Sequence, residues 1–168
     1  MSFEVADTLD MSTPDAKRAS YELLVAQVRS LLEGERDMIA NLAQFSALVW
    51  QSVPQLNWAG FYLAHGRELV VGPFQGKVAC VRIPFERGVC GACARSREIQ
   101  LVQDVHAFPG HIACDSASNS ELVLPVVAGD RLVAVFDLDS PLKSRFDAED
   151  ARGFAAAVAV LAAGTDWA

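Results

Sequence analysis

Short apolar runs separated by turn residues fill the middle and the later part of this chain, and this pattern most restricts its fold. A four-residue turn around Gly129 joins the last two runs, which predicts a hairpin and therefore antiparallel neighbours. We expect an antiparallel sheet rather than a doubly wound parallel one. The runs expected as strands are residues 58–64, 68–71, 78–83, 99–102, 122–127 and 132–138.

Helical segments flank these strands. Thr13 followed by Pro14 predicts a helix start, because Thr caps a free amide and Pro suits the first turn. The expected order of elements predicts an α+β domain, a central antiparallel sheet with helices packed on one face. The helices are expected at residues 13–34, 35–53 and 88–97, with a last one that is capped at 146–150 and ends near 164.

Size and composition indicate one compact domain over residues 13–168, after a loose N-terminal tail at 1–12. The 168 residues are 52% hydrophobic and carry a formal net charge of −7, which argues against nucleic acid or an anionic membrane as partner. No run of 18 apolar residues occurs, and the acidic N-terminus does not resemble a secretory signal. We therefore expect a cytoplasmic protein whose cysteines are kept reduced.

All four cysteines of the chain fall between Cys80 and Cys114. In the cytoplasm such a group is more typical of metal binding or thiol chemistry than of structural disulfides. The pairs Cys90-x-x-Cys93 and His111-x-x-Cys114 have a spacing close to that of a zinc ribbon. Against zinc, the first pair falls in an apolar-rich predicted helix, and a domain of this size needs no metal to fold.

Thiol redox chemistry would use the same cysteines differently. A thiolate that attacks an oxygenated sulfur becomes a sulfenic acid, a second thiol converts it into a disulfide, and an external dithiol reopens that bond. Cys114 lies in the one long irregular segment, residues 104–120, as an accessible nucleophile should. The second thiol could be Cys80, Cys90 or Cys93. Cys90 and Cys93 could also bridge each other, and Cys80 could equally be a small buried hydrophobe.

Three acidic residues are expected at one end of the sheet. Glu121 opens one strand of the hairpin, and Asp137 and Asp139 close the other, on one face because they are two residues apart. Carboxyl groups that converge in a partly desolvated pocket cannot all ionise, so at least one should have a raised pKa. A protonated carboxyl group could act as general acid on a departing oxygen. The alternative is solvent-facing charges or a cation site.

An aromatic pair and a polar turn are candidates for binding a small ligand. Strand alternation puts Trp58, Gly60 and Tyr62 on one face, with Gly60 leaving a space between the two rings. Such a space suits the apolar end of a substrate, and the alternative is that both rings pack in the core. The polar segment 116–119 could present backbone N–H groups to a carboxylate.

Four motifs together resemble one known family. NWAGFYL, GPFQGKVACVRIPFERGVCG, DVHAFPGHIACDSASNSELVLP and VFDLDS are similar to the free methionine-(R)-sulfoxide reductases, which are single-domain GAF proteins. The resemblance covers residues 20–160, and a generic GAF sensor domain lacks this set of cysteines. It implies a six-stranded antiparallel sheet with helices behind it. It also implies reduction of the free amino acid's sulfoxide, with thioredoxin as the reductant and no metal or other cofactor.

The same resemblance implies roles for individual residues. Cys114 matches the nucleophile and Cys90 the usual resolving thiol. Cys80 matches a further cysteine of the disulfide relay, whereas Cys93 departs from the family pattern. The remaining matches are Trp58 and Tyr62 around the methyl end of the substrate, Glu121, Asp137 and Asp139 around the sulfoxide oxygen, and Ser116, Ala117 and Ser118 for the backbone that holds the carboxylate.

Two other interpretations stay open. A ligand-sensing GAF module would bind a small molecule and signal to a partner, but it predicts an output domain or coiled-coil linker that this sequence does not display. A structural zinc protein would use Cys90, Cys93, His111 and Cys114. The apolar first helix suits a homodimer.

Overall fold

The computed structural model describes residues 8–112 and 114–168. Its elements follow the order predicted from the sequence. They are α1 (Pro14–Leu31), α2 (Met38–Ser52), β1 (Trp58–His65), β2 (Glu68–Gly76), β3 (Arg82–Pro84), α3 (Gly88–Ser96), β4 (Gln100–Val102), η1 (Val105–Ala107), β5 (Ser120–Ala128), β6 (Arg131–Ser140) and α4 (Ala148–Gly164).

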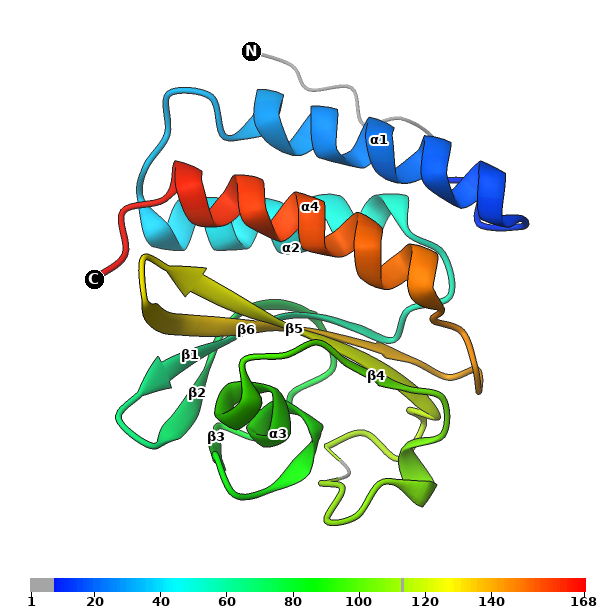
Figure 1. Cartoon of the computed structure of the whole chain (residues 1–168), viewed down its shortest axis with the longest axis vertical. Helices are drawn as coiled ribbons and strands as arrows, with labels where there is room; N and C mark the ends of the chain where they lie inside the picture. Colours follow the sequence, from blue (N-terminus) through cyan, green and yellow to red (C-terminus); the bar gives the residue numbers. More distant parts are fainter. Residues whose placement is uncertain (1–7, 113) are drawn as a thin grey trace.

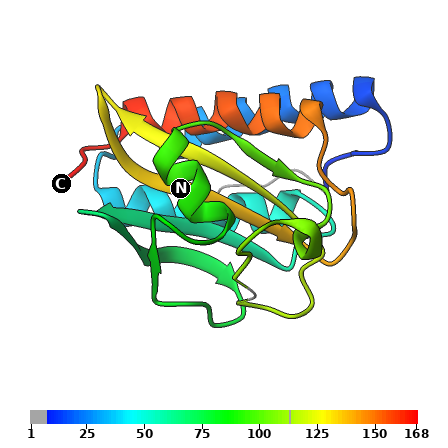
Figure 2. The same ribbon diagram turned by 60° about the horizontal axis from the view of Figure 1, so that its bottom comes forward.

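The strands form one antiparallel six-stranded sheet in the order β3-β2-β1-β6-β5-β4. β1 and β6 pair at its centre although they lie far apart in the sequence. In Figure 1, α1, α2 and α4 lie on one side of the sheet. α3 packs on the other face together with the neighbouring loops, as Figure 2 shows from below. The predicted α+β sheet with a helix layer on one face is confirmed, and α3 is an addition on the opposite face.

Alternation along the central strands divides the apolar residues between two cores. Phe61 and Phe136 point toward the helix layer, where they pack with Phe45 at ring-centroid distances of 4.8–5.6 Å. Each fully buried ring of this kind stabilises the fold by about 2–3 kcal/mol. Trp58 and Tyr62 point to the other face, into a smaller core beneath α3. This smaller core forms the floor of the site described below.

The helix starts predicted at Thr13 and at 146–150 are confirmed, whereas α2 begins at Met38, after the cap Asp37, and not near residue 35. Thr13 Oγ1 accepts a hydrogen bond from the Ala16 N–H at 3.1 Å. Asp147 and Asp150 form a reciprocal capping box at the start of α4. Both caps satisfy backbone amides that have no partner within the helix, which explains why the helices begin at these residues.

Some local expectations differ from the structure. Residues 8–12 are not a loose tail, because Leu9 is buried and its N–H donates to the Ser52 carbonyl at 2.8 Å. The rest of the predicted tail, residues 1–7, lies outside the described residues. The strand expected at 78–83 is limited to β3, since residues 77–81 form a loop after β2. Within the described ranges, no helix combines the length and apolar character needed to cross a membrane.

Candidate active site

Three neighbouring strands bring the predicted acids and an aromatic ring together. In the sheet register, Asp139 lies opposite Trp58 of β1 on one side and opposite Glu121 of β5 on the other. Asp137 shares their face because it precedes Asp139 by two residues, and it lies opposite Val123. The structure therefore places all three predicted acids on the face that α3 covers.

These carboxyl groups line a small cavity between the sheet, α3 and two loops. Its volume is about 40 Å³, which is room for a few water molecules. One loop contributes Val78 and Ala79, and the other carries Cys114 at the edge of the cavity. Most of the predicted site residues line this cavity: Trp58, Tyr62, Cys90, Cys114, Ser118, Glu121, Asp137 and Asp139.

The three carboxyl groups all have raised pKa values. Burial is the main cause, since Glu121 and Asp137 are only 6% and 5% exposed. It raises the pKa of Asp137 to about 6. The pKa values of Glu121 and Asp139 rise well above the usual range, because the charge of Asp137 adds to the effect of burial. At neutral pH we therefore expect an ionised Asp137 beside two protonated neighbours.

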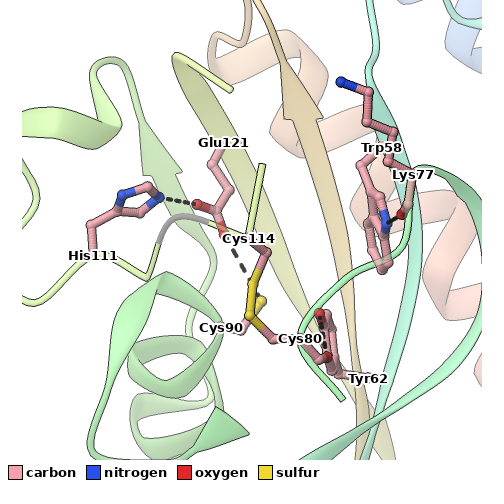
Figure 3. Close-up of a disulfide and its surroundings, with 8 residues drawn as sticks. All are labelled: Trp58, Tyr62, Lys77, Cys80, Cys90, His111, Cys114 and Glu121. Carbon is pink, nitrogen blue, oxygen red and sulfur yellow. Dashed lines mark hydrogen bonds and ion pairs between the residues drawn. A yellow bond between two sulfur atoms is a disulfide. The ribbon is translucent and has the colours of Figure 1, made fainter. Parts of the chain in front are cut away.

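Cys114 and Cys80 form a disulfide beside the cavity (Figure 3), with their Cα atoms 5.7 Å apart. Cys114 is exposed, as expected of a nucleophile on a loop, and Cys80 is half-buried in the loop after β2. The bridge expected between Cys90 and Cys114 is not the one that the structure contains. Because Cys90 lies on α3 with its thiol near Glu121, the loop cysteine Cys80 is the partner of Cys114 instead.

Cys90 and Cys93 are free thiols inside the smaller core, and they do not bridge each other. The Cys90 thiol donates to Glu121 Oε1 at 3.9 Å, and the Cys93 thiol donates to the Val123 carbonyl at 3.8 Å. Burial raises the pKa of both thiols, and the charge of Asp137 adds to this effect. Both thiols are consequently protonated and poor nucleophiles at neutral pH.

The zinc ligand set considered from the sequence is not assembled, because Cys114 is bonded to Cys80. Among the described residues, a different group brings ligand atoms of Cys90, Glu121 and Asp137 within 4.8 Å of one another. Burial raises the pKa of the Cys90 thiol and of the Glu121 carboxyl group, so both carry their protons at neutral pH when no cation lies beside them.

The aromatic pair forms a continuous wall rather than a slot. Trp58 and Tyr62 stack with ring centroids 5.6 Å apart. The space expected above Gly60 is filled, because Phe74 of β2 stacks on Trp58 at 5.1 Å. A Cβ on Gly60 would overlap the Cβ of Phe74. The glycine thus permits close approach of two strands and leaves no gap for a ligand.

The polar turn contributes to the cavity through Ser118, one of the three residues expected there. Ser118 is buried, and its hydroxyl accepts a hydrogen bond from Asn57 Nδ2 at 3.0 Å. Ser116 and Ala117 are exposed. The Ala117 N–H donates to the side chain of Asp115 at 2.9 Å. One of the backbone donors expected for a substrate carboxylate is therefore engaged by the chain's own carboxylate.

His111, which the sequence offered as a zinc ligand and as a residue that could steady Cys114, lines the cavity. Its Nε2 lies 3.8 Å from Glu121 Oε2 (Figure 3). Burial, together with the nearby His106, lowers the pKa of His111, so that it is neutral at neutral pH. Its position three residues before Cys114 in the irregular segment was the one available signal for a place at this site.

Comparison with known proteins gives consistent matches over most of the chain. The GAF domain family matches residues 19–165. The free methionine-R-sulfoxide reductase of Escherichia coli (strain K12) is 48% identical over 145 residues, which are 86% of this chain and 88% of that protein. The protein of the same name from Saccharomyces cerevisiae is 40% identical over 156 residues, 88% of this chain and 87% of that protein.

A solved structure agrees with these matches. The X-ray structure of free methionine-R-sulfoxide reductase from Neisseria meningitidis, in complex with its substrate, has a TM-score of 0.87. It is 38% identical to this chain, and the match covers 96% of this chain and 95% of that one.

The sheet and its helix layer are those of a GAF domain. The chain belongs to the family of free methionine-R-sulfoxide reductases, which are oxidoreductases built on this fold. The family and the fold implied by the sequence motifs are confirmed.

Proposed function

We propose that this protein reduces free L-methionine (R)-sulfoxide to methionine, with Cys114 as the nucleophile. The observation that carries the proposal is the setting of Cys114. It is exposed, bonded to a second cysteine, and placed at the edge of a cavity lined by carboxyl groups of raised pKa. The named activity of the E. coli and yeast relatives supports the choice of substrate.

The first step is attack of the Cys114 thiolate on the sulfoxide sulfur. A carboxylic acid donates a proton to the sulfoxide oxygen, and the resulting hydroxyl passes to the Cys114 sulfur as its bond to the substrate sulfur breaks. The bond between Cys114 and the substrate sulfur breaks as well, so that methionine leaves and Cys114 becomes a sulfenic acid. Glu121 and Asp139 are the candidates for this acid, because their raised pKa values keep them protonated at neutral pH. Asp137 supports that state through its own negative charge.

Cys80 then condenses with the sulfenic acid, which releases water and forms the disulfide. The pairing in the structure supports Cys80 in this role rather than Cys90. A reductant with two thiols, such as thioredoxin, reopens the bond. Its first thiolate attacks one sulfur of the disulfide and its second thiol frees the enzyme, so the reductant leaves oxidised and both enzyme cysteines become thiols. The cytoplasm is a compartment that supplies such reductants.

The substrate would lie with its methyl end against the wall formed by Trp58 and Tyr62. Both rings line the cavity on the side of the sheet, and apolar contact there would exclude water from the reacting sulfur. The amino acid's carboxylate is assigned to the turn of Ser116, Ala117 and Ser118. Of these residues, Ser118 already lies at the cavity.

Three cysteine variants test the proposal in a thioredoxin-coupled assay with separated epimers of free methionine sulfoxide. Cys114→Ser should form no methionine although its circular dichroism is unchanged. Cys80→Ser should release about one equivalent per enzyme and then stop, because no second thiol completes the disulfide. Cys90→Ser should keep its steady-state turnover.

Substantial turnover by Cys114→Ser would refute the assignment of the nucleophile. Loss of turnover in Cys90→Ser, with retention in Cys80→Ser, would instead give the resolving step to Cys90.

A further inference from the structure

The loop that carries Cys80 also carries two unusually exposed apolar side chains. Val78 is 88% exposed and Val81 is 62% exposed, which are the highest values among the large apolar residues that the structure describes. The next is Ile39 of α2, at 55%. Burying these valines against a partner would remove their exposed apolar surface from water, which favours association.

The backbone of this loop is held on its inner side. The Tyr62 hydroxyl donates to the Cys80 carbonyl at 3.1 Å, and the Val71 N–H donates to the Val81 carbonyl at 2.9 Å. Tyr62 belongs to the floor of the cavity, so the loop is fixed to the site it borders. Because the backbone of the loop is fixed and its valines face the solvent, these side chains form an apolar surface that exists before a partner binds.

We propose that Val78 and Val81 form the docking surface for the protein dithiol that reopens the Cys80–Cys114 disulfide. This inference rests on the proposed function and adds to it the residues that recognise the reductant. The exposure of both valines belongs to the disulfide form, which is the form that a reductant must recognise. A partner with an apolar surface around its reactive thiol would bury both valines and bring that thiol beside the disulfide.

Basic residues lie at both ends of the loop. Lys77 and Arg82 flank the valines with side chains that are 75% and 59% exposed, and each is paired with a carboxylate of this chain, Lys77 with Asp115 at 3.6 Å and Arg82 with Glu68. Because these carboxylates offset both positive charges, recognition of the reductant rests on the exposed valines and on the adjacent disulfide.

The test compares a protein reductant with a small one. Oxidised wild-type protein and the Val81→Ser variant, whose substituted side chain does not line the cavity, are reduced either by a bacterial thioredoxin with its reductase and NADPH, or by dithiothreitol. The second-order rate constant with thioredoxin should fall about fivefold in the variant, as expected for the loss of one central apolar contact. The rate constant with dithiothreitol should stay within about twofold, because a small dithiol needs no docking surface.

Ile39→Ser is the matched control, because it removes an exposed apolar side chain on the helix-covered side of the sheet, and it should leave both rate constants unchanged. Equal slowing with both reductants, an unchanged rate with thioredoxin, or no reduction of wild type by thioredoxin would overturn the proposal. So would a change in oligomeric mass of the variant, which would assign the valines to a contact between copies of the chain. Failure of the proposed function is a separate result, namely no methionine formed even with dithiothreitol.

Discussion

Asp137 controls how the acidic cluster distributes its protons. With a pKa of about 6, it is the first of the three carboxyl groups to ionise as the pH rises. Its buried charge then raises the pKa values of Glu121 and Asp139, because two nearby negative charges repel each other strongly where water is excluded. The cluster therefore keeps proton donors beside Cys114 at a pH where isolated carboxyl groups would have lost their protons.

Asp137→Asn should shift the descending limb of the pH–rate profile to lower pH, by about one unit. The first step needs a protonated acid, so its rate falls as the pH rises through the pKa of that acid. The amide removes the charge that raises the pKa values of Glu121 and Asp139, and the fall therefore begins earlier. The measurement is single-turnover methionine formation by prereduced enzyme over a range of pH.

The control for this experiment is Asp104→Asn, whose carboxylate pairs with Lys143 at 2.7 Å and does not line the cavity. Its pH–rate profile should match that of the wild type. A descending limb that stays in place, or moves to higher pH, in Asp137→Asn would contradict the assigned role of this charge.

At the scale of elements, a buried charge network joins α1 to α4. Asp150 at the start of α4 is fully buried and accepts hydrogen bonds from Lys17 Nζ at 2.6 Å and Tyr21 Oη at 2.7 Å. Arg145 lies 3.3 Å from the same carboxylate. Lys17 and Tyr21 belong to α1, whereas Asp150 belongs to α4, which packs on the sheet. This one carboxylate therefore holds α1, the outer helix, against α4.

Asp150→Ala should lower the free energy of unfolding by about 3–5 kcal/mol, because it leaves the buried Lys17 and Arg145 without their shared partner. The capping box at the start of α4 is lost as well. Urea unfolding followed by circular dichroism measures the change. Asp15→Ala is the control, since its pair with Arg18 is exposed and contributes less than about 1 kcal/mol. Equal effects of the two substitutions would contradict this account of α1 and α4.

For the whole molecule, the disulfide links the two loops that border the cavity. One loop follows β2 and carries Cys80, and the other precedes β5 and carries Cys114 (Figure 3). In this linked form the cavity has a volume of about 40 Å³, which is room for a few water molecules. Reduction removes the link, and we expect it to give an amino acid more space between the two loops.

Free methionine sulfoxide should consequently bind the reduced form and not the disulfide form. Cys114→Ser cannot form the bond and represents the unlinked state without turnover. In isothermal titration calorimetry, its affinity for the sulfoxide should exceed that of oxidised wild type by at least about tenfold. Prereduced wild type, titrated with the product methionine, is the control for an effect of the serine itself. Comparable affinity in the oxidised protein would show that the loops open without reduction.

The acids and the aromatic pair were predictable because their positions follow from local rules. Alternation along a strand puts Asp137 and Asp139 on one face, and a hairpin sets Glu121 beside them. The pairing of the thiols was not predictable in this way. The sequence alone allows either Cys80 or Cys90 to pair with Cys114. The choice between them depends on how α3 and the loop after β2 pack against the sheet.

The sequence by itself determined the order of the elements, the antiparallel sheet, the family, and the identity of the residues available for chemistry. These depend on periodicity, turns and motifs, which act over short stretches of chain. Tertiary structure alone decided that β1 lies against β6, that Phe74 fills the space above Gly60, and that Cys114 is joined to Cys80. It also raised the pKa values of the acids, because burial and charge repulsion arise only when distant segments exclude water together.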